Sequence, residues 1–284
     1  MKIAVVTGGA GFIGSHLCAR LSNEGYRVIS LDNYFAGSET AHHDGVEYRV
    51  GHTKDIAKYI TETPDIIYHL GEYSRVQQSI DEPALVFDSN GTGTFGVLEF
   101  WRTTGAKLVY AGSSTKFGDS GAARYTTPYA WVKAMNTELV AQYAAWYDLS
   151  YAIVYFYNVY GPGERSGKYG TLIGIFAEQL AQGEPLTVEE PGTQKRNFTH
   201  VDDIIDGLHL VGEKGEGDGF GIGSKEAFSV REVAEMFGAP IVMTPPRVGN
   251  RMSGELVTEK TQQLGWVQKK FLKEEIDLLC KKIS

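Results

Sequence analysis

The feature that most constrains the fold of this chain is a short apolar segment that runs directly into a glycine-rich turn. Residues 3–6 are Ile-Ala-Val-Val, and residues 7–14 read Thr-Gly-Gly-Ala-Gly-Phe-Ile-Gly. Gly8, Gly11 and Gly14 have the spacing GxxGxxG, a variant of the dinucleotide-binding fingerprint, in which a buried strand turns tightly into a helix. The start of the chain therefore predicts the first strand, turn and helix of an α/β fold.

An acidic residue at the end of the second expected strand indicates which dinucleotide binds. Asp32 lies eighteen residues after Gly14, where a carboxylate can accept hydrogen bonds from both hydroxyls of the adenosine ribose. The same carboxylate would repel a 2′-phosphate, and Asn33 and Tyr34 bring no positive charge to offset this. We therefore predict NAD rather than NADP as the cofactor, with its pyrophosphate at the N-terminus of the first helix.

The rest of the first half alternates short apolar segments with amphipathic ones, the pattern of a parallel sheet covered by helices. We expect strands near residues 2–6, 27–31, 46–50, 65–70, 107–113 and 151–156, and helices near 13–24, 54–62, 83–103 and 127–148. This regularity is lost after about residue 160. We predict a Rossmann-type doubly wound parallel sheet in an NAD-binding domain (1–160 and about 197–222), with a smaller C-terminal substrate-binding lobe (about 161–196 and 223–284).

Composition and charge argue against several other classes of protein. The net charge of −8 disfavours a nucleic-acid partner, whose phosphates need clustered Lys and Arg. No apolar segment is long enough to span a membrane. Cys18 and Cys280 have no neighbours at disulfide or metal-ligand spacing. We therefore expect a cytoplasmic protein with reduced thiols, with no metal site and no membrane or nucleic-acid partner.

Three residues in the middle of the chain form a candidate catalytic group. Tyr129 and Lys133 are four residues apart on an expected helix, so their side chains share one face. The lysine ammonium would stabilise the phenolate, which could then act as a general base toward a hydroxyl during hydride transfer. Ser113 ends the fifth expected strand, where ligands of such sheets bind. Taken alone, Tyr129 and Lys133 could be an exposed pair on a surface helix, and Ser113 could be a polar residue at a strand end. Their order after the glycine turn and Asp32 favours a catalytic role.

These motifs, with others in the same order, resemble those of the extended short-chain dehydrogenase/reductases, specifically the NAD-dependent nucleotide-sugar epimerases and dehydratases. The matching segments extend over more than two hundred residues and include 7–17 (TGGAGFIGSHL), 65–70 (DIIYHL), 157–162 (YNVYGP), 194–198 (QKRNF), 200–203 (HVDD) and 264–266 (LGW). The resemblance implies an NAD-dependent homodimeric enzyme, similar to the UDP-glucose 4-epimerases, that acts on a nucleotide-diphosphate sugar.

The resemblance also implies a role for each matching residue. Ser113 and Tyr129 would hold the sugar 4-hydroxyl, with Tyr129 as acid and base, and Lys133 would bind the nicotinamide ribose. The cofactor would be bound by Gly8, Gly11, Phe12, Ile13, Gly14, Asp32, Asn33, His52, Thr53, Leu70, Tyr129 and Lys133. The substrate would be bound by Glu72, Ser113, Asn158, Arg196, Arg247 and Gly254. Arginine suits the diphosphate because its planar fork matches phosphate oxygens.

Some residues depart from the family pattern and bear on the reaction. Residues 113–115 are Ser-Ser-Thr, where dehydratases carry Thr-Asp-Glu. This argues against 4,6-dehydration, which needs a further acid and base. The stretch from Gly118 to Tyr129 is shorter than in typical epimerases. Glu72 stands in a segment that is usually neutral, either as an additional base or sugar-hydroxyl acceptor or as an exposed loop carboxylate.

Several reactions therefore stay open at the level of sequence. The leading expectation is a nucleotide-sugar 4-epimerase that works through a transient 4-keto sugar. Glu72 and the short loop keep a 4-dehydrogenase or 4-keto reductase as the alternative. A non-catalytic NAD-sensing regulator is disfavoured, because Tyr129 and Lys133 are both present. Gly254, seven positions after Arg247, matches a residue that walls the sugar pocket of these epimerases. It predicts tolerance of a 2-acetamido sugar, although a simple turn explains it equally well.

Overall fold

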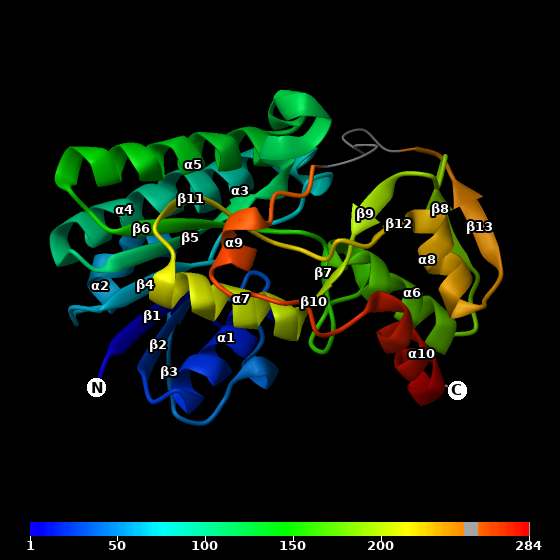
Figure 1. Cartoon of the computed structure of the whole chain (residues 1–284), viewed down its shortest axis with the longest axis horizontal. Coiled ribbons are helices and arrows are strands. Elements are labelled where there is room, and N and C mark those ends of the chain that lie inside the picture. The colour runs from blue at the N-terminus through cyan, green and yellow to red at the C-terminus, as the bar shows by residue number, and fades with distance from the viewer. Residues whose placement is uncertain (247–254, 284) are drawn as a thin grey trace.

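The computed structural model describes residues 1–246 and 255–283, with the backbone alone at 118–120 and 168. At its centre is a seven-stranded parallel sheet in the order β11-β6-β5-β4-β1-β2-β3 (Figure 1). These strands are β1 (Ile3–Thr7), β2 (Arg27–Asp32), β3 (Val46–Val50), β4 (Ile66–His69), β5 (Lys107–Ser113), β6 (Tyr151–Phe156) and β11 (Gly217–Ile222). The predicted Rossmann-type doubly wound sheet is confirmed, and its first six strands lie within one residue of the expected bounds.

Helices cover both faces of the sheet (Figure 1). One face packs against α1 (Phe12–Asn23) and α7 (Val201–Lys214). The other packs against α2 (Ile56–Tyr59), α4 (Gly93–Thr104) and α5 (Pro128–Tyr147). The remaining elements of this half are η1 (Glu39–Ala41), η2 (Thr53–Asp55), η3 (Gln78–Ile80), α3 (Pro83–Val86), the π-helical segment η4 (Phe87–Thr92) and η5 (Ser114–Tyr125). The single helix expected over 83–103 is thus three consecutive segments.

The alternation of side chains along each strand explains why the first half reads as continuous apolar runs. Ala4 and Val6 of β1 lie in the core beneath α1 and α7, whereas Val5 lies in the core on the opposite face. Successive side chains of a strand point to opposite faces, so both sets are buried when helices cover both sides. Proline opens α3 and α5 in their first turn, where the missing N–H has no helical partner to lose.

A smaller lobe with its own core completes the molecule at the right of Figure 1. It contains α6 (Leu172–Ala181), β8 (Leu186–Glu189), α8 (Val230–Phe237), β13 (Ile241–Thr244) and α10 (Leu272–Ile283). The chain passes between the sheet and the lobe through β7 (Val159–Tyr160), η6 (Gly167–Tyr169), β9 (Lys195–Asn197), β10 (Thr199–His200) and β12 (Ala227–Ser229). Strands pair as β7 with β10, β9 with β12 and β8 with β13.

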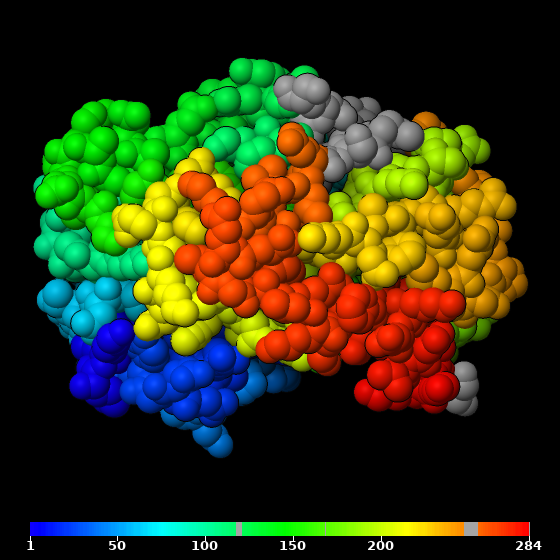
Figure 2. All heavy atoms as spheres, viewed as in Figure 1, coloured from blue at the N-terminus to red at the C-terminus, as the bar shows by residue number. Residues whose placement is uncertain are grey.

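The segment around α9 (Glu259–Gln263) packs against the sheet half, although the sequence prediction placed it in the lobe. The backbone N–H of Val257 donates to Tyr157 Oη at 3.0 Å. Trp266 lies in the core beneath α7, and its Nε1 donates to the Asp203 carbonyl at 2.8 Å. Figure 2 shows the C-terminal segment, in orange and red, crossing one face of the molecule from the sheet half to the lobe.

Among the helices of the described ranges, none is long and apolar enough to cross a membrane.

Candidate active site

The turn between β1 and α1 is shaped so that only glycine fits at two of its positions. Gly8 has φ +75°, and a Cβ there would lie 2.8 Å from Gly71 Cα. A Cβ on Gly14 would lie 2.0 Å from the Gly8 carbonyl oxygen. The N-cap residue of α1 is Gly11, which has no side chain to accept a hydrogen bond from the first turn. The first N–H groups of the helix therefore stay open to a ligand. This turn fits the pyrophosphate of a dinucleotide.

Asp32 is held at the end of β2 by the backbone on either side of it. Its Oδ2 accepts from the Ala10 N–H at 3.0 Å and its Oδ1 from the Tyr34 N–H at 2.8 Å. The side chain is buried, and burial raises the pKa of this carboxyl despite the two backbone donors. Each carboxylate oxygen keeps a further lone pair, so Asp32 fits a ribose diol at the position that the sequence predicts.

One large cavity, of about 1320 Å³, lies at the carboxyl ends of the sheet strands and extends to the lobe. Of the predicted site residues, the following line it: Gly8, Gly11, Phe12, Ile13, Gly14, Asp32, Asn33, Thr53, Leu70, Glu72, Ser113, Tyr129, Lys133, Asn158 and Arg196. Arg247 and Gly254 lie outside the described residues. The cavity thus brings together the glycine turn, the candidate catalytic group and two of the expected diphosphate ligands.

The structure does not bring His52 to the cavity wall. Its ring caps η2, since Nδ1 accepts from the Lys54 N–H at 3.1 Å. The opposite ring nitrogen, Nε2, lies 3.2 Å from Asp88 Oδ2. A ring engaged in this way by neighbouring residues is not directed at a dinucleotide, and the adjacent Thr53 lines the cavity instead.

Tyr129 lies in the first turn of α5, and its hydroxyl is the open group of the site. Thr127 caps the helix by accepting from the Ala130 N–H at 3.2 Å. The Tyr129 ring packs with Tyr73 and Val132 in a small buried cluster. Within the described part of the chain, no side chain or backbone group hydrogen-bonds its phenolic oxygen. This oxygen is therefore available to a substrate.

Ser113 ends β5 on the same cavity wall. Its Oγ lies 2.9 Å from Thr115 Oγ1 and accepts from the Thr115 N–H at 3.3 Å. Among the described residues no hydrogen bond joins Ser113 to Tyr129. Both residues line the same cavity, and neither hydroxyl is used up by the other.

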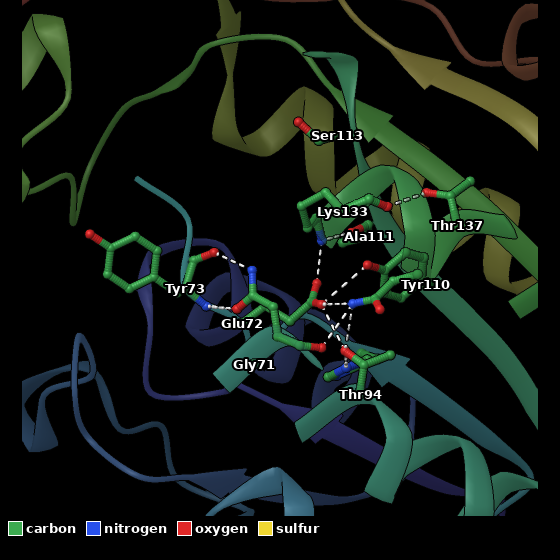
Figure 3. A network of polar contacts seen from close by, with 12 residues as sticks. Gly71, Glu72, Tyr73, Thr94, Tyr110, Ala111, Ser113, Lys133 and Thr137 are labelled. Atoms are coloured by element: carbon green, nitrogen blue, oxygen red, sulfur yellow. Dashed lines mark hydrogen bonds and ion pairs between the residues drawn. The ribbon is translucent and has the colours of Figure 1, made fainter. Parts of the chain in front are cut away.

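Glu72, which follows β4, is buried and directed at Lys133 (Figure 3). The exposed fraction is 3% for the Glu72 side chain and 5% for that of Lys133. The two form an ion pair, and the Lys133 ammonium also donates to the Ala111 carbonyl. Glu72 Oε1 accepts three further hydrogen bonds, from Thr94 Oγ1 (2.7 Å), Asn136 Nδ2 (3.0 Å) and Tyr110 Oη (3.1 Å).

This network corrects what the sequence led us to expect of Glu72. The carboxylate is not exposed in a loop, and every hydrogen bond found for it goes to a protein group. Burial, the largest single influence, would raise the pKa of Glu72, but the charge of Lys133 and the hydrogen bonds from Lys133 and Thr94 together hold the pKa below its usual value. Glu72 is therefore ionised, and its charge is paired with that of Lys133 at the cavity wall.

A chain of hydrogen bonds leads from β1 to Glu72 through a buried imidazole. Thr7 Oγ1 lies 2.7 Å from His69 Nδ1, and His69 Nε2 lies 3.0 Å from Thr94 Oγ1. Because the Thr94 hydroxyl donates to Glu72, it accepts from His69, which assigns the ring proton to Nε2. Burial lowers the pKa of His69 to about 4, so the ring is neutral at pH 7 and serves to orient the network.

The sequence interpretation missed the polar residues that surround Glu72. One of them carried a usable signal, since Asn136 lies three residues after Lys133 and so shares its helix face. Thr94 and Tyr110 belong to other elements, α4 and β5. Only the packing of these elements brings their side chains to Glu72.

Comparisons with known proteins agree with this geometry. Residues 4–223 match the NAD dependent epimerase/dehydratase family. The chain belongs to this family, and it is an enzyme with NAD as its cofactor.

Its relatives catalyse more than one reaction. A UDP-glucose 4-epimerase of Mycolicibacterium smegmatis is 30% identical over 92% of this chain and 92% of its own length. UDP-glucuronic acid decarboxylase 6 of Arabidopsis thaliana is 31% identical over 81% of this chain and 72% of its own length. The crystal structure of a UDP-glucose 4-epimerase of Thermotoga maritima with UDP-glucose superposes with a TM-score of 0.91, at 27% identity, covering 99% of this chain and 98% of the other.

Proposed function

We propose that this enzyme is a nucleotide-sugar 4-epimerase that works through a transient 4-keto sugar. The observation that carries the proposal is the state of Tyr129. Its hydroxyl lies on the cavity wall without a partner among the described residues, one helical turn from the buried Lys133. A general base needs this access to the substrate, and the ammonium of Lys133, paired with Glu72, lies on the same helix face.

Each residue of the chain then has a defined task. Held at the glycine turn and Asp32, NAD would supply the group that accepts hydride from C4 and returns it to the opposite face of the sugar. Tyr129 Oη accepts the proton of the 4-hydroxyl, keeps it while C4 is a ketone, and gives it back. Ser113 Oγ hydrogen-bonds the same oxygen and fixes its direction. Asn158 and Arg196, which line the lobe side of the cavity, bind the nucleotide diphosphate.

The environment of Glu72 supports epimerisation over its alternatives. The alternative from the sequence, a 4-dehydrogenase or 4-keto reductase of the same family, depends on the short loop before Tyr129 and on Glu72 as a further base near the sugar. Since its carboxylate is paired with Lys133, it is not available for that task. Two of the relatives described above are UDP-glucose 4-epimerases, which also supports the proposal, with a UDP-sugar as the first substrate to test.

Product analysis with a panel of nucleotide sugars tests the proposed reaction. The NAD-loaded enzyme is incubated with UDP-, GDP-, dTDP- and CDP-linked hexoses, and products are separated and identified by mass spectrometry and proton NMR. We expect a 4-epimer of unchanged mass and no net rise of NADH absorbance. Tyr129→Phe should be inactive, whereas Tyr125→Phe, a matched change at an exposed tyrosine, should not alter the rate. Stoichiometric NADH formation would contradict epimerisation.

We also propose that the enzyme is a cytoplasmic homodimer that associates through α4 and α5. Phe87, Phe95 and Trp131 are large apolar side chains exposed on this side of the sheet half, and the rings of Phe87 and Trp131 lie 6.0 Å apart. Exposed aromatic side chains on one side of a protein, two of them in ring contact, are typical of an interface. Light scattering of the wild type and of Trp131→Glu tests it: the wild type should have twice the mass of the variant.

A further inference from the structure

An arginine beside Tyr129 lies on the cavity wall without an acidic partner. Arg75 is half-buried in the segment that follows β4. Its Nε donates to the Tyr169 carbonyl at 2.7 Å, and its Nη1 donates to the carbonyl and hydroxyl of Ser74 at 3.2 and 3.0 Å. Among the residues that the structure describes, no carboxylate lies within ion-pair distance of this guanidinium, and Nη2 has no partner.

The partly buried positive charge of Arg75 is unfavourable when no ligand is bound. Burial lowers the pKa of the Arg75 guanidinium, an effect opposed by Tyr129 and reinforced by the nearby charge of Arg165. Arg165 also lines the cavity, and no ion pair holds it within the described ranges. Two neighbouring cations taken partly out of water are stabilised when a ligand brings an anion to them. The cavity is therefore built to receive negative charge at Arg75.

The position of Arg75 relative to Tyr129 indicates which part of the substrate brings that charge. Tyr73 and Val76, on either side of Arg75, pack with Tyr129 in one buried cluster, and Ser79 Oγ lies 3.4 Å from the Tyr129 backbone nitrogen. The loop that carries Arg75 thus wraps around the group that acts on C4. In a pyranose, C5 and its C6 substituent adjoin C4, whereas C1 and the diphosphate lie across the ring.

We propose that Arg75 is a specificity residue for the sugar, and that the preferred substrate is a nucleotide-linked uronic acid whose C6 carboxylate pairs with its guanidinium. The inference rests on the proposed function, because Tyr129 fixes where C4 lies. Nε and Nη1 are already held by the Tyr169 carbonyl and by Ser74, so the guanidinium is oriented before the ligand arrives and Nη2 remains to donate to it. A charge-assisted hydrogen bond from Nη2 to a carboxylate is stronger than one to a neutral hydroxymethyl group.

Ligand binding to the NAD-loaded enzyme tests this, independently of turnover. Titration calorimetry compares UDP-glucuronate, UDP-glucose and UDP on the wild type, Arg75→Gln, Arg75→Lys and Arg231→Gln. Arg231 is a matched control, because it is exposed on α8 and forms an ion pair with Glu235 on the same helix. We expect the wild type to bind UDP-glucuronate about 10- to 100-fold more tightly than UDP-glucose, the usual range for a charge-assisted contact.

The variants distinguish a C6 carboxylate from the diphosphate as the anion that Arg75 binds. Arg75→Gln should abolish the preference for UDP-glucuronate and leave UDP-glucose and UDP unchanged, and Arg75→Lys should keep part of it. Equal binding of the acidic and neutral sugars by the wild type would overturn the inference. Equal weakening of all three ligands by Arg75→Gln would also overturn it. That result would mean that Arg75 binds the diphosphate or only supports the structure of the cavity wall. Selective binding of UDP-glucuronate with no 4-epimer formed would support the uronate subsite and overturn the proposed reaction instead.

Discussion

Replacing Glu72 by glutamine removes one charge from the most deeply buried ion pair of the site. Glutamine has nearly the same shape, so it preserves the packing around Thr94, Tyr110 and Asn136. It leaves the Lys133 ammonium, whose side chain is 5% exposed, without a counter-ion. That ammonium keeps the carbonyl of Ala111 and the ring of Tyr110, whose centroid lies 4.6 Å from Nζ. The change therefore isolates the cost of a buried unpaired charge from the cost of a cavity.

The expected loss of stability follows from the burial of both partners. Breaking a buried pair on one side costs about 3–5 kcal/mol. At roughly 2–4 °C per kcal/mol for a domain of this size, the melting temperature should fall by about 6–20 °C. Glu47→Gln is the matched control. Glu47 pairs with Arg49 and Arg27, but its side chain is 44% exposed, so its loss should cost less than about 1 kcal/mol.

The assay is thermal and urea unfolding of the NAD-free protein, with a double-mutant cycle that adds Lys133→Met. Because Lys133 and Glu72 are in contact, the double variant should be more stable than the sum of the two single losses predicts. The pKa of Glu72 is held below its usual value, so its contribution is present above the unfolded pKa and lost as pH falls through the folded one. A glutamine variant that melts with the wild type, or a coupling energy near zero, would refute the reasoning.

Four further changes test other parts of the site. Tyr129→Phe should lower kcat by about 10²–10⁴-fold with unchanged NAD affinity by fluorescence titration; a near-normal rate would exclude Tyr129 as the proton carrier. Asp32→Ala should weaken NAD binding and reduce the ratio of NAD affinity to NADP affinity. An unchanged ratio would mean that the Asp32 carboxylate does not contact the ribose. The folded pKa of His69, about 4 against an ordinary 6.5, means that the unfolded chain binds more protons in that window. Stability should therefore fall from pH 6.5 to 4, and His69→Asn should flatten this slope in urea titrations. Gly254→Tyr should abolish turnover of UDP-N-acetylglucosamine and leave turnover of UDP-glucose unchanged. If neither rate changes, Gly254 does not wall the sugar pocket.

The parts of the fold that could be predicted are those in which local sequence and tertiary environment agree. The run from Ile3 to Val6 is buried on both faces of the sheet, so its hydrophobicity is continuous and the strand is visible in the sequence. The segment near Trp266 gave no such signal. Its indole is buried against α7 by contacts with residues about sixty positions earlier, and no periodicity within the segment reports them.

The same distinction separates the predicted from the unpredicted parts of the site. Gly14 and Tyr129 belong to motifs whose spacing fixes the geometry locally, the first by a close approach of backbone and the second by its place on α5. Whether Glu72 is exposed or buried depends instead on residues 22, 38, 61 and 64 positions away. His52 shows the converse, since the ring is turned from the cavity toward Asp88 on another segment.

The burial of Glu72 also changes how the positive charge beside Tyr129 is to be understood. An ammonium in contact with a carboxylate acts on a third group as a dipole, whose field falls off faster with distance than that of a lone charge. Lys133 is therefore a weaker source of phenolate stabilisation here than the YxxxK spacing alone implies. The remaining positive charge at this end of the cavity comes from Arg75 and from the oxidised nicotinamide when NAD is bound. The charge that faces Tyr129 then depends more on which cofactor state and which sugar occupy the cavity, so that a buried carboxylate links the chemistry at C4 to the ligands present.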